Sequence, residues 1–155
     1  MTRKLRFKTV QEREPISIWK VAGRPATIDE FIEDGSSRLD AIGFRQSRRS
    51  LIDRLRQKLE NSDFAVFPEL GEAVEQIIQV LRLPEAWDAT DPLPRWLAEA
   101  AFGARYLLKR FDLIEDHLPE IGLADDALLL ARILERNGFG EGPEFNGPGP
   151  DSRAA

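Results

Sequence analysis

The chain lacks cysteine altogether and has only one histidine, one tyrosine and one methionine among its 155 residues. Without cysteine it forms no disulfide, no thiolate metal site and no cysteine nucleophile, and nothing in it indicates an oxidising compartment. Metal binding is therefore limited to oxygen ligands and to the single imidazole, that of His117.

Long hydrophobic runs are also absent. No stretch approaches the roughly 18 apolar residues that a membrane span needs. The basic segment 1–6 is not followed by the apolar region of a signal peptide. We therefore expect a soluble, cytoplasmic protein with no transmembrane segment.

The composition is that of an ordinary globular chain. Hydrophobic residues make up 42% of it, and the net charge is −5 with a pI near 5.1. A chain of this length can bury a core of its own, so one domain is expected. The negative charge disfavours a nucleic-acid footprint over the whole domain but leaves room for a local basic patch.

The N-terminal residues alternate between apolar and polar side chains. Residues 4–8 and 16–21 both show this two-residue period, and the polar segment 11–15 separates them. The pattern predicts a two-stranded β-hairpin within residues 1–22. An isolated hairpin is marginally stable in water, so it should pack on helices or pair with a partner's strand.

Helical spacing dominates from residue 27 onward. Thr27 and Glu30 have the spacing of a capping box, which predicts a short helix ending at Gly35. Apolar residues at three- and four-residue intervals predict further helices over 39–60 and from Pro68 to about residue 83. The region 27–83 is therefore expected to contain the first helices.

Two more helices are predicted in the region 92–137. Asp91 and Pro92 resemble a cap followed by a first-turn proline, so one helix should begin there. The last should run from about Asp125 to Asn137, with Gly138 at its C-terminal cap and the neighbouring leucines, Leu128 included, buried. Residues 138–155 are rich in glycine and proline and are predicted to be a disordered tail.

The expected fold is therefore mainly α. It is a compact bundle of four or five helices with an N-terminal two-stranded β-hairpin and a disordered C-terminal tail. Residues 1–137 are expected to form a single globular domain.

One segment resembles a known family. Residues 106–127 read YLLKRFDLIEDHLPEIGLADDA, and this is similar to the signature of the YkvA-like domains. The match falls on Tyr106, Asp112, Leu113, Ile114, Asp116, Pro119, Gly122, Asp125 and Asp126. Arg110 and Glu115 stand where the family usually has proline. The resemblance implies a helical hairpin with an ordered acidic connection over about 92–137, and it implies no reaction.

This acidic connection is the first candidate site. Its carboxylates Asp112, Asp116, Asp125 and Asp126 are oxygen ligands of the kind that Mg²⁺ or Ca²⁺ prefers. Their spacing matches no known ligand motif. The alternative is structural, because Asp125 and Asp126 stand where the last helix is expected to begin and would cap its free amides. His117 next to Asp116 makes an acid–base pair conceivable, but no catalytic motif accompanies it.

The helix predicted over 39–60 carries the second candidate site. Arg45, Arg49 and Arg56 fall on one stripe beside its apolar face, and Arg54 and Lys58 fall on the other border. Such a helix could bind phosphates, an anionic membrane surface or an acidic partner. Alternatively, the aliphatic stems only cover the edges of the core.

Arg48 and Trp87 stand out individually. Arg48 falls in the middle of the apolar arc of its helix, so it should be buried in an ion pair or mark an interface. Trp87, in a proline-flanked segment, is the tryptophan expected to be an exposed anchor for a partner.

Together these features favour a non-enzymatic binding or protein–protein interaction module that self-associates or docks a protein partner. The first alternative is a divalent-metal-binding protein or a metal-dependent enzyme that uses the acidic connection. The second alternative binds an anionic surface or nucleic acid through the basic helix 45–58. No cofactor is expected apart from a divalent cation under the first alternative.

Overall fold

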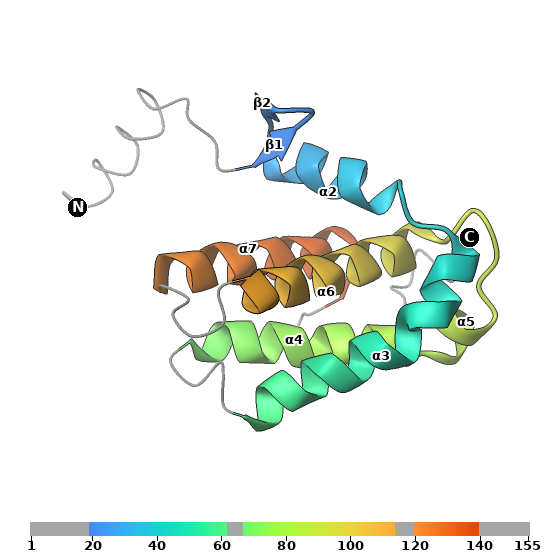
Figure 1. The fold of residues 1–155 in the computed structure, drawn as a ribbon. Coiled ribbons are helices and arrows are strands. Elements are labelled where there is room, and N and C mark those ends of the chain that lie inside the picture. Colours follow the sequence, from blue (N-terminus) through green and yellow to red (C-terminus); the bar gives the residue numbers. More distant parts are fainter. Residues whose placement is uncertain (1–18, 62–66, 114–119, 140–155) are drawn as a thin grey trace. The chain divides into compact units, whose positions relative to one another are not determined.

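The computed structural model describes residues 19–61, 67–113 and 120–139 (Figure 1). It confirms a mainly α fold with a two-stranded antiparallel sheet near the N-terminus. The chain divides into two compact units, Met1–Phe31 and Ile32–Ala155. The predicted strand at 4–8 and most of the predicted tail lie outside the described residues.

The first unit contains a hairpin that lies later in the chain than predicted. Strand β1 (Lys20–Val21) pairs antiparallel with β2 (Arg24–Pro25). Between them Ala22 and Gly23 both have positive φ, 55° and 79°, as a two-residue type I′ turn requires. The sequence pattern missed this turn because β2 is too short to show alternation. In the same unit the Trp19 ring lies 5.1 Å from that of Phe31.

Helix α2 (Ile28–Ser36) begins with the predicted capping box. The Thr27 amide donates to Oε1 of Glu30 at 2.9 Å, and the Glu30 amide donates to Oγ1 of Thr27 at 3.0 Å. The predicted end at Gly35 is wrong, because Gly35 lies inside the helix. A Cβ at this position would lie 2.1 Å from the Phe102 ring. Glycine is therefore needed here so that Phe102 can pack against the helix, and it does not end the helix.

The next two helices follow the predicted pattern closely, and a short third helix after them was not predicted. Helix α3 spans Ala41–Glu60 and α4 spans Pro68–Leu81, with proline in the first turn of α4. The proline that ends the α4 pattern opens a one-turn helix, α5 (Pro84–Trp87). The apolar spacing therefore located both long helices correctly, because one face of each is buried.

Helix α6 (Arg95–Leu113) starts later than predicted. The predicted cap at Asp91 is wrong, because the first amides of α6 donate to the carbonyl of Pro94. Asp91 instead accepts a 2.7 Å hydrogen bond from the amide of Ala41, the first residue of α3. Asp40 accepts from the Gly43 amide at 2.7 Å, so two carboxylates satisfy the free amides of α3.

We expect Asp91→Ala to lower the free energy of unfolding by about 1 kcal/mol, the usual effect of losing a capping carboxylate. Asp88→Ala is the matched control, since Asp88 follows α5 and caps no described amide through its side chain. Urea denaturation of both variants measures the difference. Equal stability of Asp91→Ala and the wild type would show that the bond to Ala41 contributes nothing.

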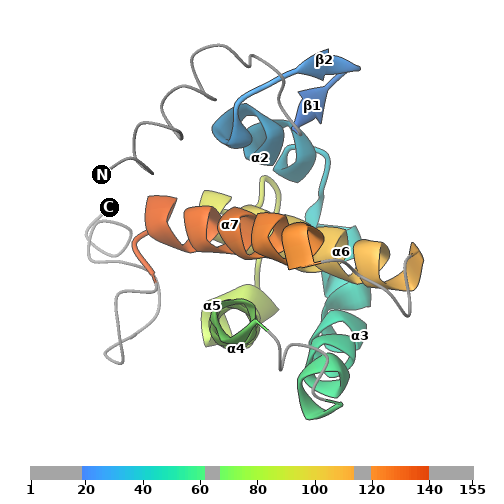
Figure 2. The same ribbon diagram turned by 90° about the vertical axis from the view of Figure 1, so that its left-hand side faces the viewer.

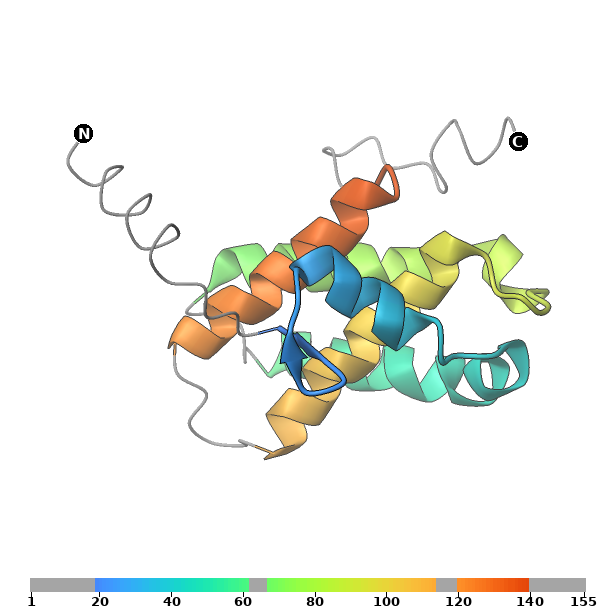
Figure 3. The same ribbon diagram turned by 90° about the horizontal axis from the view of Figure 1, so that it is seen from above.

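Four helices build the core of the second unit. Helices α3 and α4 pack side by side, and α6 and α7 (Glu120–Arg136) lie against them, with α4 contacting both (Figure 2). Seen from above, α6 and α7 run side by side and cross α3 and α4 at an angle (Figure 3). Fully buried side chains from all four helices fill the centre: Leu55, Leu70, Ile77, Leu81, Leu97, Leu107, Leu108, Leu129, Leu130 and Ile133. None of the described helices is long and apolar enough to cross a membrane.

Helix α7 ends at the predicted glycine. Gly138 has φ of 81°, and the Phe139 amide donates to the Leu134 carbonyl at 2.8 Å, as in a Schellman motif. Phe139 is buried, with its ring 6.2 Å from that of Trp96, so the packed region extends beyond residue 137. The predicted burial of Leu128 is wrong, because 54% of it is exposed.

Candidate functional site

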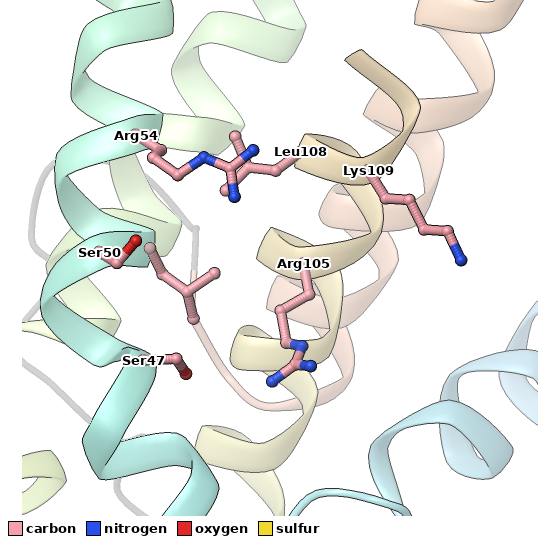
Figure 4. Close-up of a pocket in the computed structure, with 7 residues that line it drawn as sticks. Ser47, Ser50, Arg54, Arg105, Leu108 and Lys109 are labelled. Carbon is pink, nitrogen blue, oxygen red and sulfur yellow. The ribbon is translucent and has the colours of Figure 1, made fainter. Parts of the chain in front are cut away.

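A pocket of about 340 Å³ lies between α3 and α6 (Figure 4). We call it the basic pocket, because the charged side chains among its described lining residues are all cationic. The residues that line it are Ser47, Ser50, Leu51, Arg54, Arg105, Leu108 and Lys109.

Helical spacing explains how two helices form this pocket. The four residues from α3 are spaced at i, i+3, i+4 and i+7, and the three from α6 at i, i+3 and i+4, so each set shares one face. Leu51 and Leu108 are buried and join the core. Arg54 and Arg105 point into the space between the helices, whereas Lys109 lies at the rim and points away from α3.

Three positive charges gather here, and no acidic residue is among the lining residues that the structure describes. Arg105 and Lys109 are four residues apart on one helix, where like charges repel and destabilise the helix by about 0.2–0.5 kcal/mol. Arg54 adds a third positive charge from α3. Within the described part of the chain, no carboxylate forms an ion pair with Arg105 or Lys109. An anion would therefore relieve this repulsion.

The two serines differ in what they offer. The Ser47 hydroxyl donates to the Gly43 carbonyl at 3.0 Å, which is common for serine within a helix. Ser50 is exposed at the pocket wall and makes no such bond in the described structure. The pocket thus supplies guanidinium, ammonium and hydroxyl donors. Its described lining residues include no histidine or carboxylate that could act as a general base.

The predicted stripe of Arg45, Arg49 and Arg56 lies on the other border of α3 and does not line this pocket. Arg45 donates a short hydrogen bond to the Ala89 carbonyl, so it holds the connection between α5 and α6. Arg49 and Arg56 are exposed. Anion binding by this stripe stays a prediction.

Arg48 is buried, but not in an ion pair with any described residue. Its guanidinium lies 3.4 Å from the centre of the Trp87 ring, a cation–π contact that pairs the charge with an aromatic face. Burial, with a smaller effect of the neighbouring Arg49, lowers the pKa of Arg48 from its usual value. Trp87 remains 52% exposed, so it is available to anchor the protein partner or second copy that the sequence predicts.

The acidic connection is only partly described. Asp112 belongs to α6 and Asp116 lies outside the described residues, as does His117. Asp125 and Asp126 are in the second turn of α7, because the helix begins at Glu120. The prediction that they cap its start is therefore wrong. A single glycine, here Gly122, costs about 1 kcal/mol in a helix and did not stop it.

Asp125 is half-buried, and Asp126 is buried because it lies three, four and seven residues before Leu129, Leu130 and Ile133 on one face. In the described ranges no three carboxylate or histidine side chains gather in a way that could hold a metal ion. Metal binding by Asp112, Asp116, Asp125 and Asp126 stays a prediction.

The sequence pattern placed Arg54 on one border of the apolar face of α3. It did not predict the residues of α6 that line the pocket together with Arg54. The sequence contained a signal for Arg105 and Lys109. They are four positions apart, so they share one face of the helix, and they stand on either side of Leu108, which belongs to the apolar stripe. What the sequence did not show is that α6 packs beside this border of α3.

No family model, curated protein or solved structure matches this chain. The resemblance of residues 106–127 to YkvA-like domains therefore stays a prediction.

Proposed function

We propose that this chain is a non-enzymatic binding module that holds an anionic ligand in the basic pocket. The observation that carries the proposal is that Arg54, Arg105 and Lys109 line one pocket and are its only charged residues among those that the structure describes. In a chain of net charge −5, a pocket whose described charged residues are all cationic is a specific feature.

The chemistry of the lining supports binding over catalysis. Serine becomes a nucleophile only beside a general base, and no histidine or carboxylate is among the described residues that line the pocket. Arginine suits anion recognition because its planar guanidinium presents several donors in a fixed geometry. The described part of the site thus has groups that hold a negative charge and none that would activate an attacking group.

Calorimetric titration with inorganic pyrophosphate at low ionic strength tests the proposal. We expect one binding site per chain and an affinity that falls as salt is added, because exposed charges are screened. Arg105→Gln should weaken binding about tenfold, the usual effect of losing one charge-assisted hydrogen bond.

Arg56→Gln is the matched control. It removes the same charge from α3 at an exposed position outside the pocket, so the affinity for pyrophosphate should stay within a factor of about two. Equal losses in Arg105→Gln and Arg56→Gln would show that the whole basic surface attracts the anion. That result, or no binding by the wild type, would contradict the proposal.

A further inference from the structure

We infer that Arg48, Arg49 and Trp87 form a docking surface for an acidic segment of a partner protein. One carboxylate of the partner binds the Arg48 guanidinium, and a neighbouring apolar side chain packs on the ring of Trp87. We call these three residues the Trp87 surface. It is separate from the basic pocket, because none of the three lines that pocket.

Arg48 is a buried cation without a carboxylate partner in the described part of the chain. The residue is 8% exposed, and its contact within the described ranges is the one to the Trp87 ring, 3.4 Å from the ring centre. Its nitrogens are not among the fully covered polar atoms that lack a hydrogen bond, so they still reach solvent. Buried charges are normally paired with an opposite charge and hydrogen-bonded. A carboxylate from a partner would supply both at the edge of this guanidinium.

Trp87 is held in place by two contacts that leave half of it exposed. Its Nε1 donates to the Arg82 carbonyl in a long hydrogen bond of 3.5 Å, and Arg48 covers one face of the ring. Because the indole is already fixed, a partner that packs on it loses less conformational entropy on binding. Tryptophan and arginine are also the residues that most often dominate the binding energy of protein interfaces.

Arg49 adds a second positive charge to this surface. Burial lowers the pKa of Arg48, and the nearby charge of Arg49 lowers it further, which shows that the two cations are close. Arg49 is exposed, and no carboxylate of the described ranges forms an ion pair with it. The two cations therefore favour a negatively charged partner and would steer it toward Trp87.

A second copy of the chain and a nucleic acid fit this surface less well. In a symmetric dimer the same patch faces itself, so Arg48 and Arg49 would meet their own copies at like charge. A nucleic acid brings a dense row of phosphates, and the exposed acidic residues Glu85 and Asp88, on either side of Trp87 in the chain, would repel it. A protein segment with one carboxylate next to an apolar side chain matches both the paired cations and the indole.

A selection from a library of random peptides on the immobilised full chain tests the inference. We expect the enriched peptides to share an aspartate or glutamate next to a large apolar residue. The most enriched peptide is then synthesised with a fluorescent label, and its affinity is measured by fluorescence anisotropy. Replacing its acidic residue by the corresponding amide should weaken binding about tenfold, because a charge-assisted hydrogen bond becomes a neutral one.

Variants of the chain show whether this peptide binds at the Trp87 surface. Trp87→Ala should weaken binding about thirtyfold, as for a residue at the centre of an interface. Its matched control is Leu128→Ala, which removes an equally exposed apolar side chain from α7. Arg49→Gln should weaken binding about fivefold, with Arg56→Gln as the control at another exposed position of α3. Both controls should bind within a factor of about two of the wild type.

Each possible outcome supports or overturns the assignment. Circular dichroism checks that the variants fold, and Arg49→Gln decides the question if Trp87→Ala does not fold. A library without an acidic motif, or equal losses in Arg49→Gln and Arg56→Gln, would overturn the inference. Loss of peptide binding in Arg105→Gln would place the peptide in the basic pocket instead. A dimer in light scattering that Trp87→Ala dissociates would identify a second copy as the occupant, and single-stranded DNA that binds more tightly than the peptide would identify a nucleic acid. Each of these results would also overturn it.

Discussion

Glu99→Gln is expected to lower the free energy of unfolding by about 3 kcal/mol, the lower end of the cost of breaking a buried ion pair. Glu99 on α6 is 1% exposed and accepts hydrogen bonds from both Nε and a terminal nitrogen of Arg136, at 2.9 and 3.0 Å. Oε1 of Glu99 also accepts a 2.7 Å hydrogen bond from the side-chain nitrogen Nδ2 of Asn137. Replacement by glutamine keeps the shape and removes the charge, so the Arg136 guanidinium loses its buried counter-ion.

The loss should not reach the upper end of that range. Arg136 also forms a 3.0 Å ion pair with Glu33, which has 62% of its side chain exposed. That partner remains in the variant and compensates part of the charge. The network ties α2, α6 and α7 together, so its loss should act on the whole second unit and not on one helix end.

Urea denaturation measures this effect, and Glu135→Gln is the matched control. Glu135 lies on α7, the helix that also carries Arg136, and forms a 3.0 Å ion pair with Arg132. This pair is on the exposed side of α7, where 68% of the Glu135 side chain is accessible. Such surface pairs contribute about 0–1 kcal/mol. A Glu99→Gln variant no less stable than Glu135→Gln would mean that the buried network contributes no more than a surface pair.

Gly103→Ala should lower the free energy of unfolding by about 2 kcal/mol, within the usual cost of overpacking a core. Helix propensity alone predicts the opposite sign, because alanine favours a helix by about 1 kcal/mol over glycine. A Cβ at Gly103 would lie 2.8 Å from Cδ1 of Ile133 and 2.9 Å from Cδ2 of Leu130. Both side chains are fully buried and have little room to move.

Gly43→Ala provides the comparison, since it adds the same methyl group to a helix without a packed neighbour. The nearest atom to a Cβ there is Oδ1 of Asp40 at 3.0 Å, on an exposed side chain that needs to shift by only a few tenths of an ångström and can keep its hydrogen bond to the Gly43 amide. Its stability should be unchanged or raised by up to about 1 kcal/mol. Thermal denaturation of both variants distinguishes the two environments. Stabilisation by Gly103→Ala would show that α6 and α7 do not pack as closely as described.

Local sequence signals determined most of the helices. The Thr27 and Glu30 capping box, the proline at the start of α4 and the glycine after α7 each act within one helical turn. Apolar spacing then predicted which face of α3 and α4 is buried. These features are legible because the interactions behind them join residues three to five positions apart.

The errors have the opposite character, because they concern contacts between distant residues. Asp91 caps a helix that begins 50 residues earlier, so its role is invisible from its neighbours. Gly35 looked like a helix end, but it makes room for a ring from α6. Asp125 and Asp126 looked like caps because the last helix was expected to begin there, yet α7 begins at Glu120 and continues through Gly122.

The candidate site also combines features that neighbouring residues determine with features that depend on contacts between distant residues. The sequence by itself determined that α3 would carry cations on both borders of its apolar face, and Arg54 was among them. Only the tertiary structure decided which border lines a pocket, because packing placed Arg105 and Lys109 of α6 beside Arg54, whereas Arg45 binds the carbonyl of Ala89. Helical periodicity orders side chains around one axis. It contains no information on which neighbouring helix will face them.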